Sequence, residues 1–255
     1  MPFIDVDKVA FHYLEAGEGA PVLLLGGTLS SAQGDFGAQL EGLSSSRRAI
    51  APDRRGYGRT RPPDRTYPDN FYQRDASDMA AFIDAMNLES TAVLGWSEGA
   101  DVAMCLAALH PNRVTHLVIW GGVSCVEAED ICVFEGRRDV TKWHPKAREA
   151  MTAIYGDGYW QRTWQGWCDV MVRLHATGGD VHLPRLEEIK CPTLILHGAK
   201  DPLIRPQHPH TLHHRIPHST FEVFSDAGHN LHVTRAADFN QRVLEFLGNQ
   251  RKASL

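Results

Sequence analysis

The sequence lacks three features that would each have pointed to a particular class of protein. It has no surplus of basic residues, because it contains 26 Lys and Arg and 31 Asp and Glu, which gives a net charge of −5. This balance excludes nucleic acid as a primary partner. It has no apolar run near the roughly 18 residues of a membrane span. Its five cysteines form no CxxC pair, which argues against zinc ribbons and disulfide frameworks.

The first residues, Met-Pro-Phe-Ile-Asp-Val-Asp, carry neither the basic start nor the apolar core of a signal peptide. The odd number of cysteines indicates reduced thiols. We therefore expect a cytoplasmic protein, or a mitochondrial one if a transit peptide has been removed. We further expect a monomer that uses no cofactor or metal and binds neither a membrane nor nucleic acid.

The 255 residues are 43% hydrophobic and 22% charged, a balance that supports one globular domain with a sizeable core. Short apolar runs predict buried strands, and helical spacing at 79–86, 102–109 and 239–247 separates several of them. Strand and helix in alternation predict an α/β fold with a mostly parallel sheet. An alternating stretch at 9–13, followed by a glycine turn at 17–19, predicts an antiparallel hairpin at one edge. The predicted buried strands lie at 22–25, 49–51, 91–94, 117–120, 193–196 and 221–224.

About 70 residues separate the strand near Trp120 from the strand near Pro192, which is too long for an ordinary loop. We interpret 123–190 as a helical cap inserted after the sixth strand, with 1–122 and 191–255 forming the core domain. The cap holds four of the six tryptophans, and three of these, at 160, 164 and 167, would share one helix face. Packing of the cap onto the core is the simpler explanation of this stripe, and roofing an apolar substrate pocket is compatible with it.

Residues 95–99, Gly-Trp-Ser-Glu-Gly, match the G-x-S-x-G pattern of a nucleophile elbow. The pattern needs glycine on both sides because the turn from strand to helix leaves no room for side chains there. A predicted strand precedes it and a predicted helix follows it, which is the setting that the elbow requires. Ser97 is therefore the candidate nucleophile.

A serine hydroxyl needs a base to accept its proton and a carboxylate to orient that base. Asp201 and His229 each follow a predicted strand, so both are expected at the same rim of the sheet as Ser97. Asp226 is a rival acid and His232 a rival base. The oxyanion donors are expected to be the backbone N–H groups of Glu98 and Thr28, with Leu29 second to Thr28.

These residues, with Asp-Arg-Arg-Gly-Tyr-Gly at 53–58, resemble the α/β-hydrolase superfamily nearly end to end. Stretches at 35–37, 61–65, 95–97, 118–121, 135–136, 138–140, 142–143 and 228–232 narrow this resemblance to the valacyclovir hydrolase family, also called biphenyl hydrolase-like. That resemblance implies hydrolysis of α-amino acid esters, including prodrugs, and of homocysteine thiolactone. It also implies that the residue after the nucleophile binds the substrate's α-ammonium group, and here that residue is Glu98 in place of the family's aspartate.

This sequence differs from the family's pattern at a second position, since Gly26 replaces the family's proline in the oxyanion loop. For Glu98 the alternative is a first-turn helix residue that favours the helix dipole. We expect the substrate, a small-molecule ester, to contact mainly residues of the elbow, the oxyanion loop and the cap, namely Glu98, Leu29, Trp96, Trp143, Trp164 and Leu203.

Two other functions stay open. The same triad could cleave a carbon–carbon bond in ring-cleavage diketones, although Glu98 beside the nucleophile would repel an anionic substrate. The chain could also be a non-enzymatic receptor on a hydrolase scaffold. Five histidines within 208–218 invite a metal site, but no Cys or carboxylate ligand lies nearby at metal spacing, so a polar surface helix is the preferred interpretation.

Overall fold

The computed structural model describes residues 2–182 and 185–248. Eight strands form one sheet in the order β1-β2-β4-β3-β5-β6-β7-β8, antiparallel at the β1-β2-β4 edge and parallel from β4 onward. Each predicted strand is present. The strands are β1 (Phe3–Val6), β2 (Val9–Ala16), β3 (Pro21–Leu25), β4 (Arg48–Pro52), β5 (Thr91–Trp96), β6 (Val114–Trp120), β7 (Thr193–Gly198) and β8 (Ser219–Phe224).

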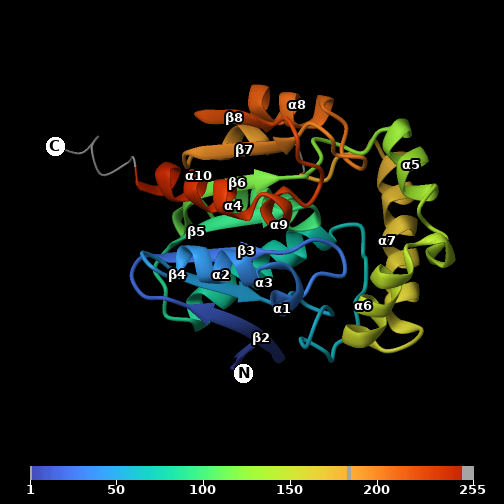
Figure 1. The fold of residues 1–255 in the computed structure, drawn as a ribbon, viewed down its shortest axis with the longest axis horizontal. Helices are drawn as coiled ribbons and strands as arrows, with labels where there is room; N and C mark the ends of the chain where they lie inside the picture. Colours follow the sequence, from blue (N-terminus) through green and yellow to red (C-terminus); the bar gives the residue numbers. More distant parts are fainter. Residues whose placement is uncertain (1, 183–184, 249–255) are drawn as a thin grey trace.

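Helices cover both faces of the sheet and produce two apolar layers (Figure 1). One layer packs against α3 (Phe71–Ala85), α4 (Glu98–Leu109) and α8 (Gln207–Arg215). The other packs against α1 (Ala32–Asp35), α2 (Gly37–Leu43), α9 (Leu231–Thr234) and α10 (Ala236–Gly248). The central strands β3 to β7 are buried on both sides, which explains their apolar runs. The prediction of a buried strand at 221–224 was wrong in its burial, because β8 lies at the edge of the sheet and leaves Val223 52% exposed.

The antiparallel edge differs from the predicted hairpin in its turn. β2 forms a hairpin with β1, which precedes it, through Asp7 and Lys8, both with positive φ. The glycines at 17 and 19 instead lead out of β2 into β3, which pairs with β4 and β5 and not with β2. Alternation correctly identified an antiparallel strand of a hairpin at this edge, although β1 and not β2 is the outermost strand. The glycine pair marks a crossing of the sheet and not the hairpin turn.

The predicted insertion after the sixth strand is present as three helices, α5 (Ala128–Glu135), α6 (Pro145–Tyr155) and α7 (Tyr159–Ala176). Figure 1 shows them together beyond the carboxyl ends of the parallel strands. The tryptophan stripe on α7 has both expected roles. Trp160 is buried with Tyr155 against the core domain, whereas Trp164 and Trp167 stack on each other and line a pocket.

Candidate active site

The strained turn at Ser97 places its hydroxyl at the end of β5. Ser97 adopts φ 55° and ψ −128°, a conformation that side chains rarely take, and its N–H donates to the carbonyl of Trp120 on β6. A Cβ at Gly99 would lie 2.2 Å from the carbonyl oxygen of Leu25, and one at Gly95 would lie 2.5 Å from that of Gly99. Both glycines are therefore required for β5 and α4 to meet at this angle.

Asp201 and His229 reach the same rim from the loops after β7 and β8. Nδ1 of His229 lies 2.8 Å from Oδ2 of Asp201, while Oδ1 of Asp201 accepts the N–H groups of Leu203 and Ile204 at 2.8 and 3.1 Å. Burial raises the pKa of Asp201, but the bonds to His229 and these two amides outweigh it and hold the pKa below its ordinary value. The carboxylate therefore stays ionised and fixes the imidazole.

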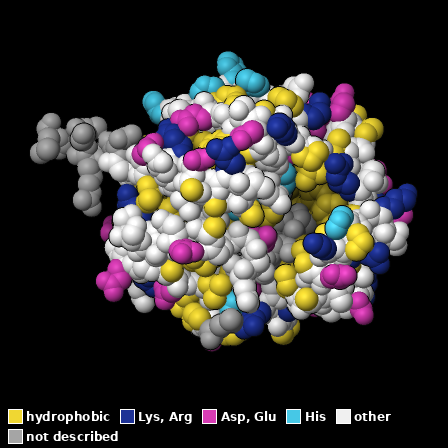
Figure 2. All heavy atoms as spheres, in the orientation of Figure 1, with side chains coloured by type: hydrophobic (Ala, Val, Ile, Leu, Met, Phe, Trp, Pro, Cys, Tyr) yellow, Lys and Arg dark blue, Asp and Glu magenta, His cyan; other side chains and the backbone are white. Residues whose placement is uncertain are grey.

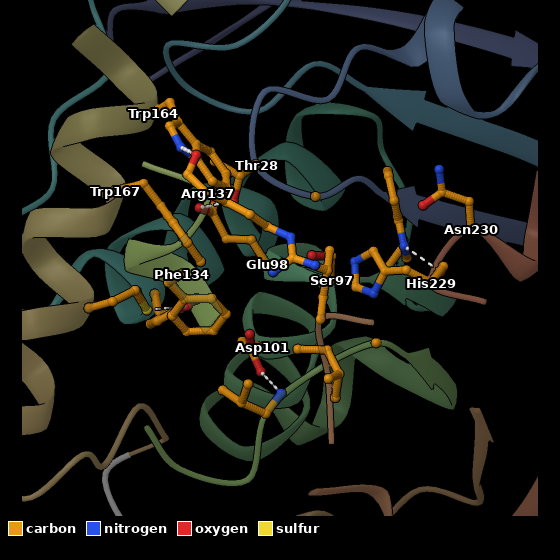
Figure 3. Close-up of a pocket in the computed structure, with 18 of the residues that line it drawn as sticks. Thr28, Ser97, Glu98, Asp101, Phe134, Arg137, Trp164, Trp167, His229 and Asn230 are labelled. Atoms are coloured by element: carbon orange, nitrogen blue, oxygen red, sulfur yellow. Dashed lines mark hydrogen bonds between the residues drawn. The ribbon is translucent and has the colours of Figure 1, made fainter. Parts of the chain in front are cut away.

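Ser97 and His229 line one pocket, and their side chains face each other there (Figure 3). The rival residues are placed elsewhere. Asp226 is exposed and pairs with Arg235 on the surface. His232 is fully buried, with Nδ1 3.1 Å from the indole nitrogen of Trp120, and burial lowers its pKa to about 3. Neither residue is placed to act on Ser97, so the structure brings together Ser97, His229 and Asp201 and not the rival residues.

The loop after β3 approaches the elbow from the opposite side. A Cβ at Gly27 would lie 3.0 Å from Cβ of Ser97, and Thr28 lines the same pocket. The guanidinium of Arg54 holds this loop by donating to the carbonyls of Gly26 and Gly27 at 2.8 and 3.1 Å. Glu98 is the first residue of α4, where backbone N–H groups lack partners within the helix. This arrangement is compatible with the oxyanion role predicted for the Thr28 and Glu98 amides.

The Glu98 side chain has partners that the sequence did not indicate. Its Oε1 accepts from Arg54 at 2.8 Å and from Arg65 at 2.9 Å, and Tyr57 and Thr28 donate to the same carboxylate. The carboxylate is inaccessible to solvent, as is the guanidinium of Arg65, and both arginines also pair with buried Asp75. Two buried guanidinium groups therefore face two buried carboxylates, and Arg74 also pairs with Asp75 at the edge of this cluster.

A pocket of about 250 Å³ lies between the core domain and the cap. Figure 2 shows the surface hollowed there, with hydrophobic side chains in the hollow. Five of the six predicted substrate contacts line it, namely Glu98, Trp96, Trp143, Trp164 and Leu203. Leu29 is the exception, because it is buried in a cluster with Tyr57, Val140, Tyr155 and Trp160.

Apart from two glycines, the sequence analysis missed nine lining residues, among them Phe134 and Arg137 from the cap. Trp167 could have been found from its spacing on the tryptophan stripe, and Asn230 from its place beside His229. Arg137 carried no such signal, since it follows α5 in a segment with no periodic pattern. The others are Tyr72, Asp101, Val123, Met171 and Ile204.

The histidine-rich helix contributes one residue to a polar cluster with the cap. His208 is buried, with Nε2 2.9 Å from Oδ1 of Asp130, and Glu127 lies beside this pair. No carboxylate ligand was expected near these histidines, but the fold supplies these two from α5 and its N-cap. Arg205 donates to both carboxylates, so they already pair with a cation.

No helix among the described residues is long and apolar enough to cross a membrane.

The fold, the elbow and the His229–Asp201 pair together define a hydrolase of the α/β type. The chain belongs to the alpha/beta hydrolase family, whose profile matches residues 22–242. It is 38% identical to serine hydrolase BPHL from Homo sapiens over 247 residues, which are 96% of this chain and 85% of that protein. The chain is thus a serine hydrolase related to BPHL, and the predicted superfamily and family are confirmed.

More distant relatives include 2-hydroxy-6-oxo-6-(2'-aminophenyl)hexa-2,4-dienoic acid hydrolase from Metapseudomonas resinovorans, 26% identical over 97% of this chain and 91% of that protein. Among solved structures, a meta-cleavage product hydrolase from Pseudomonas fluorescens superposes with a TM-score of 0.81 at 22% identity, covering 98% of each chain. This last likeness concerns the fold.

Proposed function

We propose that this protein hydrolyses carboxylic esters through an acyl-enzyme on Ser97. The 2.8 Å contact between His229 and Asp201, beside a serine held at the end of β5, is the observation that supports it. The carboxylate fixes the imidazole so that its other nitrogen is available to the serine hydroxyl. An apolar pocket on the same side gives room for the acyl or alcohol part of a small ester.

In the first half of the reaction, His229 takes the proton of Ser97 as the serine oxygen attacks the ester carbonyl carbon. Negative charge gathers on the carbonyl oxygen, where the amides of Thr28 and Glu98 would donate hydrogen bonds. His229 then returns the proton to the departing alcohol. In the second half, water attacks the acyl-enzyme as it loses a proton to His229, the bond to Ser97 breaks to release the acid, and His229 returns the proton to the Ser97 oxygen.

A fluorophosphonate probe tests this function directly. We expect the probe to label the wild-type protein at Ser97, and 4-nitrophenyl butyrate to be hydrolysed with a rate that Ser97→Ala reduces by several orders of magnitude. A folded protein that neither reacts with the probe nor hydrolyses the ester would instead be a receptor on a hydrolase scaffold.

The specificity for α-amino acid esters, and with it thiolactone hydrolysis, is a finer prediction that depends on Glu98. An α-ammonium group would have to share this carboxylate with two guanidinium groups and two hydroxyls already bonded to it. We propose that Glu98 organises this buried cluster and does not select the substrate's amine. Two cations already pair with this carboxylate, so a third gains little there.

Comparing an α-amino acid ester with its des-amino analogue tests the role of Glu98. We expect the 4-nitrophenyl esters of an α-amino acid and of its des-amino analogue to be hydrolysed with kcat/KM values within about tenfold of each other, which corresponds to roughly 1.4 kcal/mol. A preference for the amino ester well above this, lost on Glu98→Gln, would restore the ammonium-binding role.

Carbon–carbon bond hydrolysis is the second candidate. The distant relative named above is described as acting on a dienoic acid. The electrostatic objection to such an anionic substrate is weaker than the sequence implied, since Arg54 and Arg65 balance the charge of Glu98. Loss of dienone absorbance on incubation with a 2-hydroxy-6-oxohexa-2,4-dienoate, absent in Ser97→Ala, would favour this function over ester hydrolysis.

A further inference from the structure

The cap places one cation in the apolar pocket. Arg137 lines the pocket, and Figure 3 shows its side chain directed from the cap toward the middle of the site, where Ser97 lies. Its backbone carbonyl accepts the indole N–H groups of both Trp143 and Trp164, each at 3.0 Å. Two tryptophans that line the same pocket therefore fix the position of Arg137, which makes this a built feature and not a loose surface side chain.

The guanidinium of Arg137 has no carboxylate partner within the described part of the chain. Its side-chain hydrogen bonds go to the carbonyl oxygens of Val133 and Pro202, both at 3.2 Å. These two neutral acceptors steady the group between α5 and the loop that carries Asp201, but they leave its charge uncompensated. A guanidinium has five N–H donors, so several remain for a ligand.

The other charged groups of the pocket do not balance Arg137. The carboxylate of Glu98 is already paired with Arg54 and Arg65 in the buried cluster. Asp101 is buried and its Oδ1 is already engaged, because it accepts the N–H of Val123 at 3.1 Å and lies 3.4 Å from Nε2 of His182. His229 is already paired with Asp201. The pocket as a whole therefore favours a negatively charged ligand.

We infer that Arg137 is a substrate-binding residue that recognises a carboxylate in the ester, a short distance from its scissile carbonyl. This inference rests on the proposed ester hydrolysis and deepens it by naming the substrate class. Arginine suits the task because its planar fork binds a carboxylate by two parallel hydrogen bonds, and the surrounding tryptophans limit screening by water. The carboxylate can belong to the acyl part, as in half-esters of dicarboxylic acids, or to the alcohol part, as in esters of hydroxy acids.

The experiment compares esters matched in length and differing in charge. One pair is monomethyl glutarate and methyl valerate, which places the carboxylate in the acyl part. The other is the butyrate ester of glycolic acid and propyl butyrate, which places it in the alcohol part. We expect one anionic ester to exceed its neutral partner in kcat/KM by about 10- to 100-fold, the range of a charge-assisted hydrogen bond.

Substitution then assigns the preference to Arg137. Arg137→Met should bring the ratio of anionic to neutral kcat/KM close to one, mainly through KM, and Arg137→Lys should keep part of it. Arg138→Met is the matched control, since Arg138 is the next residue but pairs with Glu135 and Asp169 outside the pocket. The ratio should be unchanged in this control. Salt should lower the ratio only where Arg137 is present.

Failure of the inference is distinguishable from failure of the proposed function. If wild-type protein hydrolyses the neutral esters but shows no preference for either anionic one, only the role of Arg137 is overturned. If Arg137→Met slows anionic and neutral esters equally, Arg137 acts by holding the cap. If no ester is hydrolysed and Ser97 takes no fluorophosphonate, the proposed function itself fails.

Discussion

The guanidinium of Arg54 lies 2.8 Å from the carboxylate of Glu98, although 44 residues separate them in the chain. The same guanidinium holds the loop that carries Thr28 by its bonds to Gly26 and Gly27. One buried arginine thus ties the residue after the nucleophile to the loop on the other side of the predicted oxyanion site. The geometry around Ser97 consequently depends on an ion-pair cluster and not on the triad alone.

Removing one arginine from the cluster around Glu98 should lower the stability of the fold. We expect Arg54→Met to lower the free energy of unfolding by about 3 to 5 kcal/mol, because Glu98 would remain buried with one cation fewer. Adding Glu98→Gln should recover at least about 1 kcal/mol of that loss, which urea denaturation of the two single variants and the double variant would measure. Strictly additive effects would contradict the coupling.

Loss of the triad carboxylate should reduce activity far more than stability. We expect Asp201→Asn to lower kcat for a reactive ester on the order of 10⁴-fold, since an amide cannot hold the imidazole in the required tautomer. Asp226→Asn is the matched control, because this rival acid sits three residues before His229 but pairs with Arg235 at the surface. Equal losses in both variants would show that the acid had been assigned wrongly.

The elbow glycine should tolerate no side chain. We expect Gly99→Ala to destabilise the fold by about 3 kcal/mol, because the new Cβ would lie 2.2 and 2.4 Å from the carbonyl oxygens of Leu25 and Gly26. Gly37→Ala on α2 has nothing within 4 Å of its Cβ and should change stability by less than about 0.5 kcal/mol. Thermal unfolding of the two variants makes the comparison.

His232 should make stability depend on pH in acid. Burial, and secondarily the charge of His229, lower its pKa to about 3, whereas the unfolded chain protonates this group near pH 6.5. The unfolded state therefore binds an extra proton between these values, so stability is full above pH 6.5 and falls as the pH drops toward 3.

The variant His232→Gln isolates this contribution. Its unfolding free energy should decline less steeply between pH 6 and pH 4 than that of wild type, by up to about 1.4 kcal/mol for each pH unit. Urea midpoints across this range measure the difference. Parallel curves would place the acid sensitivity in other groups.

Much of the fold could be predicted because its signals are local. Continuous apolar runs marked β3 to β8, and helical spacing marked α3, α4 and α10. The length between Trp120 and Pro192 revealed the insertion after β6. The β1–β2 hairpin was misplaced because glycines at 17 and 19 look the same in a hairpin and in a crossing to a non-adjacent strand, and pairing partners are not encoded locally.

The site could be predicted where chain order and strand ends constrain it, and Ser97, Asp201 and His229 are such residues. Leu29 was misjudged because its loop turns the side chain into the cluster around Trp160 and away from the pocket. The carboxylates beside His208 were missed because they come from α5 and its N-cap, far away in the chain: Asp130 precedes His208 by 78 positions.

The sequence by itself determined which residues can perform ester chemistry and that parallel strands would carry them to one rim, since both follow from local pattern and strand direction. Only the tertiary structure decided which charged side chains around the site are paired and which are not. Glu98 meets Arg54 and Arg65 while Arg137 meets no carboxylate among the described residues, and both outcomes depend on how distant segments pack. Electrostatic pairing acts through space over a few ångströms, so the polarity of this pocket cannot be obtained from neighbours along the chain.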